Sequence, residues 1–446
     1  MYELIEVLPV DPAAARVYEH GWQSWSPSTD HPATATGARP VRPVTQIMSY
    51  RPGRPGPSRG FQGEGLLAVE PGDGTTVVYG CADGLTGVAS IRAEPDGDRL
   101  VISAEGPVTA RTHPGPLYDA LSAWADGFAL RAGAGPIRPA PTVWCSWYHY
   151  FEHVTEADVD ENLRAVVDAA LPVDVLQIDD GWEAEIGDWL DLSDRFASLE
   201  GLAKRIRDAG MRPGIWVAPF LAGARSRVVR EHPEWLIRAD GGHAGAGHNW
   251  DQDLAGLDVT HPGAAAYLRE TFGTLRAAGF DYFKIDFLYA GALDGPRHSG
   301  AGPLEAYREG LRLIRQTIGP EAYLLGCGAP ILPSVGLFDA MRVSADTAPQ
   351  YEPWYGDPAL PGQRGAVLST VGRAWQHGRF WVNDPDCLIV RPEVERREEW
   401  AEVVERYGGL RASSDRIAAL DAWGLETTRR LLSDVPPPVP FPAPAS

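Results

Sequence analysis

Four apolar segments of this chain end in side chains that could carry out acid, base or nucleophilic chemistry. Hydrolysis of a glycosidic bond needs two carboxyl groups beside the anomeric carbon, one to attack it and one to protonate the leaving oxygen. Asp286 and Asp346 form the best candidate pair, because each closes an apolar segment. The four segment ends are Ile178-Asp179-Asp180, Lys284-Ile285-Asp286, Ser344-Ala345-Asp346 and Asn383-Asp384-Pro385-Asp386.

The neighbours of these two aspartates give them different roles. Lys284 lies two residues before Asp286, on the same side of a strand, so its charge is expected to keep the Asp286 carboxylate ionised and ready to attack. Asp346 follows Arg342 and is expected at the wall of a cleft close to the anionic Asp286, which raises its pKa toward that of a general acid. We therefore predict Asp286 as the nucleophile and Asp346 as the acid/base catalyst.

Each of these residues also has an interpretation unrelated to catalysis. A single aspartate at the end of a barrel strand is more often a helix cap or an ion-pair partner, so only the whole set favours a site. Asp179 and Asp180 are adjacent like charges that need several donors, and sugar hydroxyls supply donors, so we favour sugar binding for both. Trp216 fits equally well as a wall of a sugar site and as a packed core residue.

Two further patterns do not indicate a site. His149 and His153 have the spacing of metal ligands on a helix, but no third ligand can be identified, so we expect no metal there. The Gly-rich stretch 241–247 lacks both the Lys and the preceding strand of a phosphate-binding loop. We interpret it as a flexible loop.

From Thr142 onward, apolar strand-like segments alternate with amphipathic helical ones. This α/β alternation predicts a closed (β/α)8 TIM barrel over residues 142–422, and the C-terminal ends of its strands, where the aspartates lie, open onto one face. Strands are expected in TVWCSWY, DVLQIDD, RPGIWVAP, YFKIDF, YLLGCG, AMRVSAD and FWVND, with the eighth near Gly408 to Ser413, and helices at about 155–170, 198–209, 303–318 and 393–407.

The regions on either side of the barrel have different patterns. Residues 1–112 contain short β-type segments separated by Gly, Pro and Asp turns, which predicts an N-terminal antiparallel β-sandwich domain. Residues 113–141 form a linker with a helical segment at about 115–130. Residues 423–446 are a short C-terminal segment, and its Pro-rich end is expected to be disordered.

Composition narrows the class of partner. The chain has 60 acidic and 40 basic residues and a net charge of −20, which disfavours nucleic acid and anionic membranes and favours a neutral small molecule. The four cysteines are widely separated, which indicates neither a disulfide scaffold nor a zinc site. The N-terminus lacks the basic and apolar regions of a secretion signal, and no long apolar run is present, so we expect a cytoplasmic protein.

Several motifs occur together in one order: Gly21-Trp-Gln-Ser-Trp-Ser, Trp144-Cys-Ser-Trp-Tyr, Gln177-Ile-Asp-Asp-Gly-Trp, Ile186-Gly-Asp-Trp, Lys284-Ile-Asp-Phe, Cys327-Gly, Arg342-Val-Ser-Ala-Asp and Trp381-Val-Asn-Asp-Pro-Asp. In this order they resemble the melibiase-like α-galactosidases of glycoside hydrolase family 36, whose clan also includes family 27. So many motifs in one order would be very unlikely by chance.

The resemblance implies an exo-acting enzyme that releases terminal α-D-galactosyl residues by a retaining double displacement. Asp286 then occupies the nucleophile position and Asp346 the acid/base position, while Asp179 and Asp180 hold galactose hydroxyls. The resemblance implies no metal and no organic cofactor. The other residues that it places around the sugar are Trp216, Lys284, Cys327 and Arg342, with Trp25 reaching in from the N-terminal domain.

The sequence departs from the family in two places and leaves alternatives open. Members commonly have a C-terminal β-sandwich after the barrel and a larger N-terminal domain than the one expected here. Those parts commonly form subunit contacts and outer subsites, so the oligomeric state and the preferred aglycone stay open. An α-N-acetylgalactosaminidase or a galactosyltransferase resembling raffinose synthase is a close alternative, because both use the same covalent intermediate. A family 31 α-glucosidase fits the motifs less well. A catalytically silent sugar-binding barrel is disfavoured, because both carboxylates are present.

Overall fold

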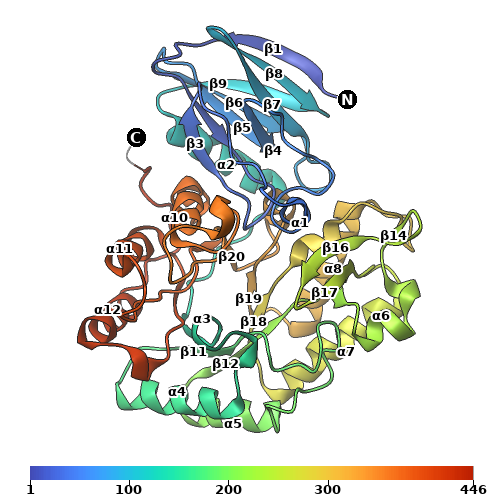
Figure 1. Cartoon of the computed structure of the whole chain (residues 1–446), viewed down its shortest axis with the longest axis vertical. Helices are drawn as coiled ribbons and strands as arrows, with labels where there is room; N and C mark the ends of the chain where they lie inside the picture. Colours follow the sequence, from blue (N-terminus) through green and yellow to red (C-terminus); the bar gives the residue numbers. More distant parts are fainter. Residues whose placement is uncertain (445–446) are drawn as a thin grey trace.

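An antiparallel sandwich lies over one end of a parallel barrel in the computed structural model, which describes residues 1–444 (Figure 1). The sandwich consists of a four-stranded sheet in the order β1-β8-β7-β4 and a five-stranded sheet in the order β3-β2-β5-β6-β9. The predicted N-terminal β-sandwich is thus confirmed. Its strands are β1 (Glu3–Pro9), β2 (Arg16–Glu19), β3 (Thr29–Pro32), β4 (Phe61–Glu64), β5 (Leu66–Glu70), β6 (Thr75–Cys81), β7 (Ser90–Asp96), β8 (Arg99–Glu105) and β9 (Val108–Pro114).

The barrel has eight parallel strands in the order β21-β20-β19-β18-β12-β11-β10-β22. A parallel bridge between Leu388 and Ser413 joins the two ends of this sheet. The strands are short and buried, as expected where helices cover a parallel sheet. The predicted barrel is confirmed, with strands β10 (Thr142–Cys145), β11 (Val175–Ile178), β12 (Arg212–Val217), β18 (Tyr282–Ile285), β19 (Tyr323–Gly326), β20 (Ala340–Arg342), β21 (Val382–Asp384) and β22 (Arg411–Ser413).

Helices follow the strands, and local signals set their ends. Thr155 caps the N-terminal end of helix α4, and its side chain forms a reciprocal capping box with Asp158. Helix α7, which the periodicity did not reveal, has Pro262 at its first position. The left-handed Gly279 caps its C-terminal end. The main helices are α2 (Leu117–Ala132), α4 (Glu156–Asp168), α5 (Leu199–Asp208), α7 (Pro262–Ala278), α8 (Pro303–Ile318), α10 (Gln363–Gly372), α11 (Arg397–Tyr407) and α12 (Ala422–Ser433), and the shorter ones are α1 (Pro43–Met48), α3 (Trp147–Tyr150), α6 (Arg227–Glu231) and α9 (Ile331–Ser334).

The segment between β12 and α7 forms a small β structure of its own, so the prediction of a flexible loop at 241–247 is wrong. Strands β14 (Arg238–Ala239) and β15 (Gly242–His243) form a hairpin, and β13 (Leu221–Gly223), β17 (Gln252–Gly256) and β16 (Gly245–Asn249) form a sheet. Gly247 has φ +109°, and a Cβ there would lie 2.4 Å from Cγ of Met48 in α1. The glycine therefore permits close packing of this sheet against the N-terminal domain.

A buried arginine joins the two domains. Arg373, at the C-terminal end of α10, is fully buried and donates hydrogen bonds to the backbone carbonyls of Ser24 (2.7 Å), Gln23 (2.8 Å) and Val343 (2.7 Å). The backbone N–H of Ser24 donates to Ala329 (3.1 Å) beyond β19. These bonds hold the 21–26 motif against the barrel, at the level of the strand ends.

The Pro-rich C-terminal segment lies against the barrel. The Phe441 ring stacks on His377 with 3.9 Å between centroids, and a Cβ on Gly378 would lie 2.4 Å from the carbonyl carbon of Val439. This ordered packing differs from the disorder expected from composition; for Ala445 and Ser446 that expectation lies outside the described residues. Over residues 1–444, no helix combines the length and apolar character that crossing a bilayer would require.

Candidate active site

A cavity with about 430 Å³ of space, including its opening to solvent, lies at the C-terminal ends of the barrel strands. Residues that follow β11, β18 and β20 line it, as the geometry of a parallel barrel requires. We call this space the inner cavity. The predicted site residues that line it are Asp179, Asp180, Asp286, Asp346, Trp216, Lys284 and Trp25.

Asp286, the first residue after β18, is held by neutral donors. Its Oδ2 accepts the indole N–H of Trp216 (3.0 Å), and its Oδ1 accepts the backbone N–H of Phe287 (2.7 Å). Phe287 has φ +51°, an uncommon conformation for a bulky residue, and this turn directs the chain away from the strand at the carboxylate. Trp216 is therefore both packed in the barrel, at 1% exposure, and bonded to the predicted nucleophile.

The direct partner of Lys284 is Asp179, whereas the sequence pointed to Asp286. The Lys284 Nζ donates to Oδ1 of Asp179 (2.9 Å), and the same oxygen accepts from Nε2 of Gln177 (2.7 Å). The lysine and both its neighbouring carboxylates are buried. Burial lowers the pKa of Lys284, but the nearby charges of Asp179 and Asp286 raise it by more than burial lowers it. The net shift is upward, so the ammonium stays charged. Lys284 thus acts on Asp286 only at longer range.

Asp180 has a different environment from Asp179. Its Oδ2 accepts the indole N–H of Trp250 (2.8 Å), which comes from the turn between β16 and β17. Burial raises the pKa of Asp180 well above its ordinary value, and the nearby Glu183 raises it further. Burial also raises the pKa of Glu183, so this pair of carboxyl groups binds a proton more readily than exposed carboxyl groups do, and its protonated member can donate a hydrogen bond.

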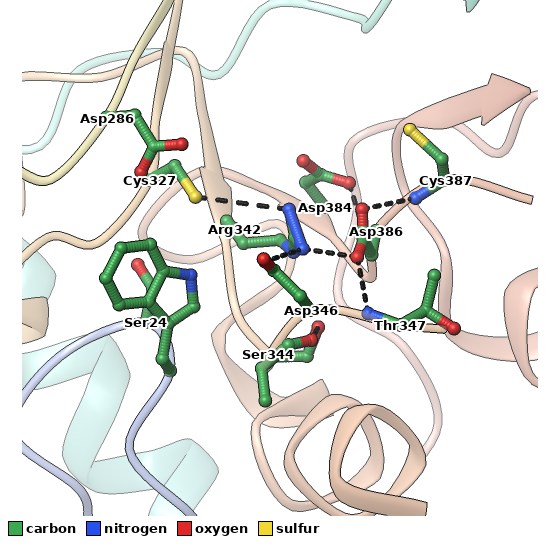
Figure 2. A network of polar contacts seen from close by, with 12 residues as sticks. Ser24, Asp286, Cys327, Arg342, Ser344, Asp346, Thr347, Asp384, Asp386 and Cys387 are labelled. Atoms are coloured by element: carbon green, nitrogen blue, oxygen red, sulfur yellow. Dashed lines mark hydrogen bonds and ion pairs between the residues drawn. The ribbon is translucent and has the colours of Figure 1, made fainter. Parts of the chain in front are cut away.

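A buried arginine connects Asp346 to a second aspartate, as Figure 2 shows. The Arg342 Nη2 donates to Oδ1 of Asp346 (2.6 Å), to Oδ2 of Asp386 and to the hydroxyl of Tyr148 (3.0 Å). The Asp386 carboxylate also accepts the backbone N–H groups of Thr347 (2.7 Å) and Cys387 (2.7 Å). Burial raises the pKa of Asp386 to about 7, although Arg342 opposes this.

Asp346 differs from the other carboxylates because its side chain is 31% exposed. Burial raises the pKa of Asp346, Arg342 lowers it, and the charge of Asp286 raises it again, with a net upward shift. The sequence pointed to Asp286 as the cause, whereas burial contributes most. A carboxyl group with a raised pKa thus faces the same cavity as the hydrogen-bonded Asp286.

Two predicted site residues lie behind the inner cavity wall. Arg342 is 1% exposed and reaches the cavity only through Asp346. The Cys327 thiol is equally buried, and Arg342 Nη1 lies 3.9 Å from its Sγ (Figure 2). Trp25, by contrast, reaches the cavity from the N-terminal domain, and its ring packs edge-on against Phe287 at 5.0 Å between centroids.

Comparison with known proteins identifies the family. Residues 138–290 match the family model described as Melibiase. The structure of TtGalA, an α-galactosidase from Thermus thermophilus in complex with stachyose, is 31% identical and has a TM-score of 0.79, with 97% of this chain and 93% of that chain covered. The chain belongs to the melibiase-like α-galactosidases of glycoside hydrolase family 36.

Two curated relatives match over shorter segments, and a further solved structure shares the fold at lower identity. Curated relatives include α-galactosidase AgaA of Geobacillus stearothermophilus, 28% identical over 166 residues (35% of this chain), and the bifunctional α-galactosidase/sucrose kinase AgaSK of Mediterraneibacter gnavus, 33% identical over 110 residues (23% of this chain). These alignments cover only 22% and 11% of the relatives' own lengths. The AgaA structure, at 14% identity and a TM-score of 0.61 over 96% of this chain and 61% of its own, shows the shared fold.

Sequence reasoning missed several aromatic and amide residues of this family 36 site. Trp147, Tyr148 and Phe287 belong to quoted motifs, so their proximity to the aspartates was a signal that could have been used. Asn249 and Trp250 gave no such signal, because a separate small sheet brings them to the cavity. Asp386 was recognised only as a segment end, and its ion pair with Arg342 depends on the barrel.

Proposed function

We propose that this chain is an exo-acting α-galactosidase that releases terminal α-D-galactosyl residues with retention of configuration. One observation carries the proposal. Two aspartates in different environments line the same cavity: Asp286 accepts hydrogen bonds from neutral donors, and Asp346 has a pKa that burial raises. The 31% identity to the Thermus thermophilus α-galactosidase over nearly the whole chain supports galactose as the sugar.

The first step forms a covalent galactosyl-enzyme. The Asp286 carboxylate attacks the anomeric carbon as the glycosidic C–O bond breaks, and Asp346 transfers its proton to the departing oxygen. In the second step, Asp346, now a carboxylate, takes a proton from water. That water attacks the anomeric carbon and releases Asp286. Two inversions at the same carbon leave its configuration unchanged.

The remaining residues of the inner cavity are assigned to binding. Asp179 and the Asp180–Glu183 pair accept and donate hydrogen bonds to galactose hydroxyls, and Lys284 has further N–H donors beyond the one given to Asp179. Trp216 and Trp25 supply flat apolar walls. Arg342 positions Asp346, and Cys327 packs beside the guanidinium, behind the cavity wall. The small size of the cavity favours a single terminal sugar, which supports exo action.

The test compares 4-nitrophenyl α-D-galactoside with the α-D-glucoside and the α-N-acetylgalactosaminide, using the purified chain and its Asp286→Ala variant. Asp281→Ala is the matched control, because Asp281 lies before the same strand, at its other end, and pairs with Arg212 (3.1 Å). We expect selective galactoside turnover that is lost only in Asp286→Ala, with NMR showing α-galactose as the first product. Equal turnover by wild type and Asp286→Ala would rule out Asp286 as the nucleophile. Preference for the N-acetylgalactosaminide would show that the enzyme is an α-N-acetylgalactosaminidase and not an α-galactosidase.

A further inference from the structure

A wider cleft adjoins the inner cavity at its open side. It has about 1,620 Å³ of space and shares Trp147, Tyr148, Asn249, Trp250 and Asp346 with the inner cavity. We call this space the outer cleft. Asp346, the proposed proton donor to the leaving oxygen, lies on the boundary between the two spaces. The part of a substrate beyond the cleaved bond therefore has to enter the outer cleft.

Large aromatic side chains line the outer cleft and remain exposed. Trp354 is 56% exposed and Phe151 is 40% exposed, and Phe151 packs edge-on against Trp147 at 5.3 Å between centroids. An exposed aromatic surface of this kind beside a catalytic pocket marks a ligand-binding surface. Phe151 comes from the segment after β10 and Trp354 from the segment after β20, so different elements supply the two aromatic surfaces.

The segment that presents Trp354 is firmly held. Asp357 is fully buried and accepts hydrogen bonds from the Tyr50 hydroxyl (2.9 Å) and the Val41 backbone N–H (3.1 Å), both in the N-terminal domain. The Arg42 guanidinium lies 5.0 Å from the centroid of Tyr355, which has φ +55°. Such backbone strain in a bulky residue persists only where the surroundings impose it. Trp354 is thus an exposed side chain on a fixed support.

Uncommon backbone conformations recur in the aromatic residues around both spaces. Among the described residues, Phe151, Trp250 and Phe287 also combine an aromatic side chain with a positive φ, of 51°, 50° and 51°. Such conformations are unfavourable for bulky residues, and residues of this kind cluster at binding sites. Their concentration here, at residues that line the inner cavity or the outer cleft, indicates that the positions of the rings matter for a ligand.

We propose that Trp354, together with Phe151, forms an aglycone platform that takes neutral oligosaccharides with two or more sugar residues beyond the cleaved bond. This inference rests on the proposed function. The cleft carries three carboxyl groups, those of Glu152, Asp251 and Asp346, against one guanidinium, that of Arg42, so acidic groups predominate and disfavour anionic ligands. Asn249 and Gln350 offer amide groups to hydroxyls. Stacked aromatic rings and amides together suit a polyhydroxylated, uncharged chain.

The experiment measures kcat and KM of wild type, Trp354→Ala and Trp354→Tyr on substrates of increasing aglycone length: 4-nitrophenyl α-D-galactoside, melibiose, raffinose and stachyose. We expect Trp354→Ala to lower kcat/KM for raffinose and stachyose about three- to tenfold, mainly through KM, because a stacking contact is lost. The nitrophenyl galactoside and melibiose should change less than twofold. Trp354→Tyr should retain most of the activity on the long substrates.

Trp423→Ala is the matched control, because Trp423 is also partly exposed, at 36%, but lies on α12 under the Arg397 guanidinium. It should behave as wild type on all four substrates. Equal losses on short and long substrates in Trp354→Ala, or no loss on raffinose and stachyose, would overturn the platform while leaving the proposed function intact. Absence of galactoside turnover by wild type would instead overturn the proposed function and the platform with it.

Discussion

Replacing Asp386 with Asn tests whether the Arg342 network sets the protonation of Asp346. Nη2 of Arg342 donates to both Asp346 and Asp386, so their two accepting oxygens lie at most about 5 Å apart. The negative charge of Asp386 favours the protonated form of Asp346 and shares the guanidinium with it. In Asp386→Asn the carboxylate is gone, and Asp346 is left as the carboxylate partner of Arg342. Both changes lower the pKa of Asp346.

The size of the effect follows from Coulomb's law. Two unit charges 5 Å apart interact by about 1–3 kcal/mol for effective dielectric constants from 80 down to 20. Because the Asp346 side chain is 31% exposed, solvent screens the pair and the lower end applies. An energy of about 1 kcal/mol corresponds to roughly fivefold in the protonated fraction, and hence in rate, on the basic side of the pH profile. The effect should be largest above pH 7, where Asp386, with its pKa of about 7, is charged in the wild type.

The assay is the pH dependence of kcat/KM on melibiose, whose sugar leaving group needs a proton. We expect the basic limb in Asp386→Asn to move to lower pH, with a smaller effect on 4-nitrophenyl galactoside. Asp339→Asn is the matched control, because Asp339 pairs with Arg138 and Arg315 (both 2.7 Å) just before β20 begins, at the opposite end from Asp346. A basic limb that stays in place or moves to higher pH in Asp386→Asn would refute the reasoning.

Three further predictions concern other parts of the structure. Asp346→Ala should slow melibiose hydrolysis by about 10²–10⁴ but slow formation of the galactosyl-enzyme from 2,4-dinitrophenyl galactoside far less; equal losses in pre-steady-state kinetics would contradict the acid role. Trp250→Phe removes the 2.8 Å indole bond to Asp180, and we expect KM for galactosides to rise about tenfold or more, whereas an unchanged KM would separate Trp250 from binding. Arg373→Met leaves buried carbonyls without their donor, and denaturant unfolding should show a loss of about 3 kcal/mol, with no loss if the domains are joined by other contacts.

The sequence predicted the parts of the site that barrel geometry alone determines. Asp179, Asp286 and Asp346 could be grouped because the C-terminal ends of all parallel strands open onto one face. The partner of Lys284 could not be predicted, because spacing along one strand favours Asp286. In the closed barrel, Asp179, which follows β11, comes within reach of Lys284 on β18. Contacts across a barrel interior depend on the closure and register of the sheet, and the sequence of one segment contains neither.

Residues outside the regular alternation were harder to place for a related reason. The 241–247 stretch has little apolar periodicity, so its strands form through pairing and through the contact of Gly247 with Met48. Trp250 reaches Asp180 only because that small sheet is fixed in place. Trp354 likewise depends on Asp357 binding the N-terminal domain. In each case a contact between separate parts of the chain decides which side chains surround the aspartates.

The distribution of charge around the inner cavity suits the chemistry proposed for it. Lys284 forms a close ion pair with Asp179, and Arg342 bridges Asp386 and Asp346, so neither cation has the attacking Asp286 as its direct partner. Asp286 receives only neutral donors, so much of its negative charge remains available beside the anomeric carbon. Glycoside cleavage develops positive charge at that carbon in the transition state, while the bound galactoside is neutral. An arrangement that pairs Asp179, Asp346 and Asp386 with cations but gives the attacking Asp286 only neutral donors therefore stabilises the transition state more than the substrate, which is the requirement for catalysis.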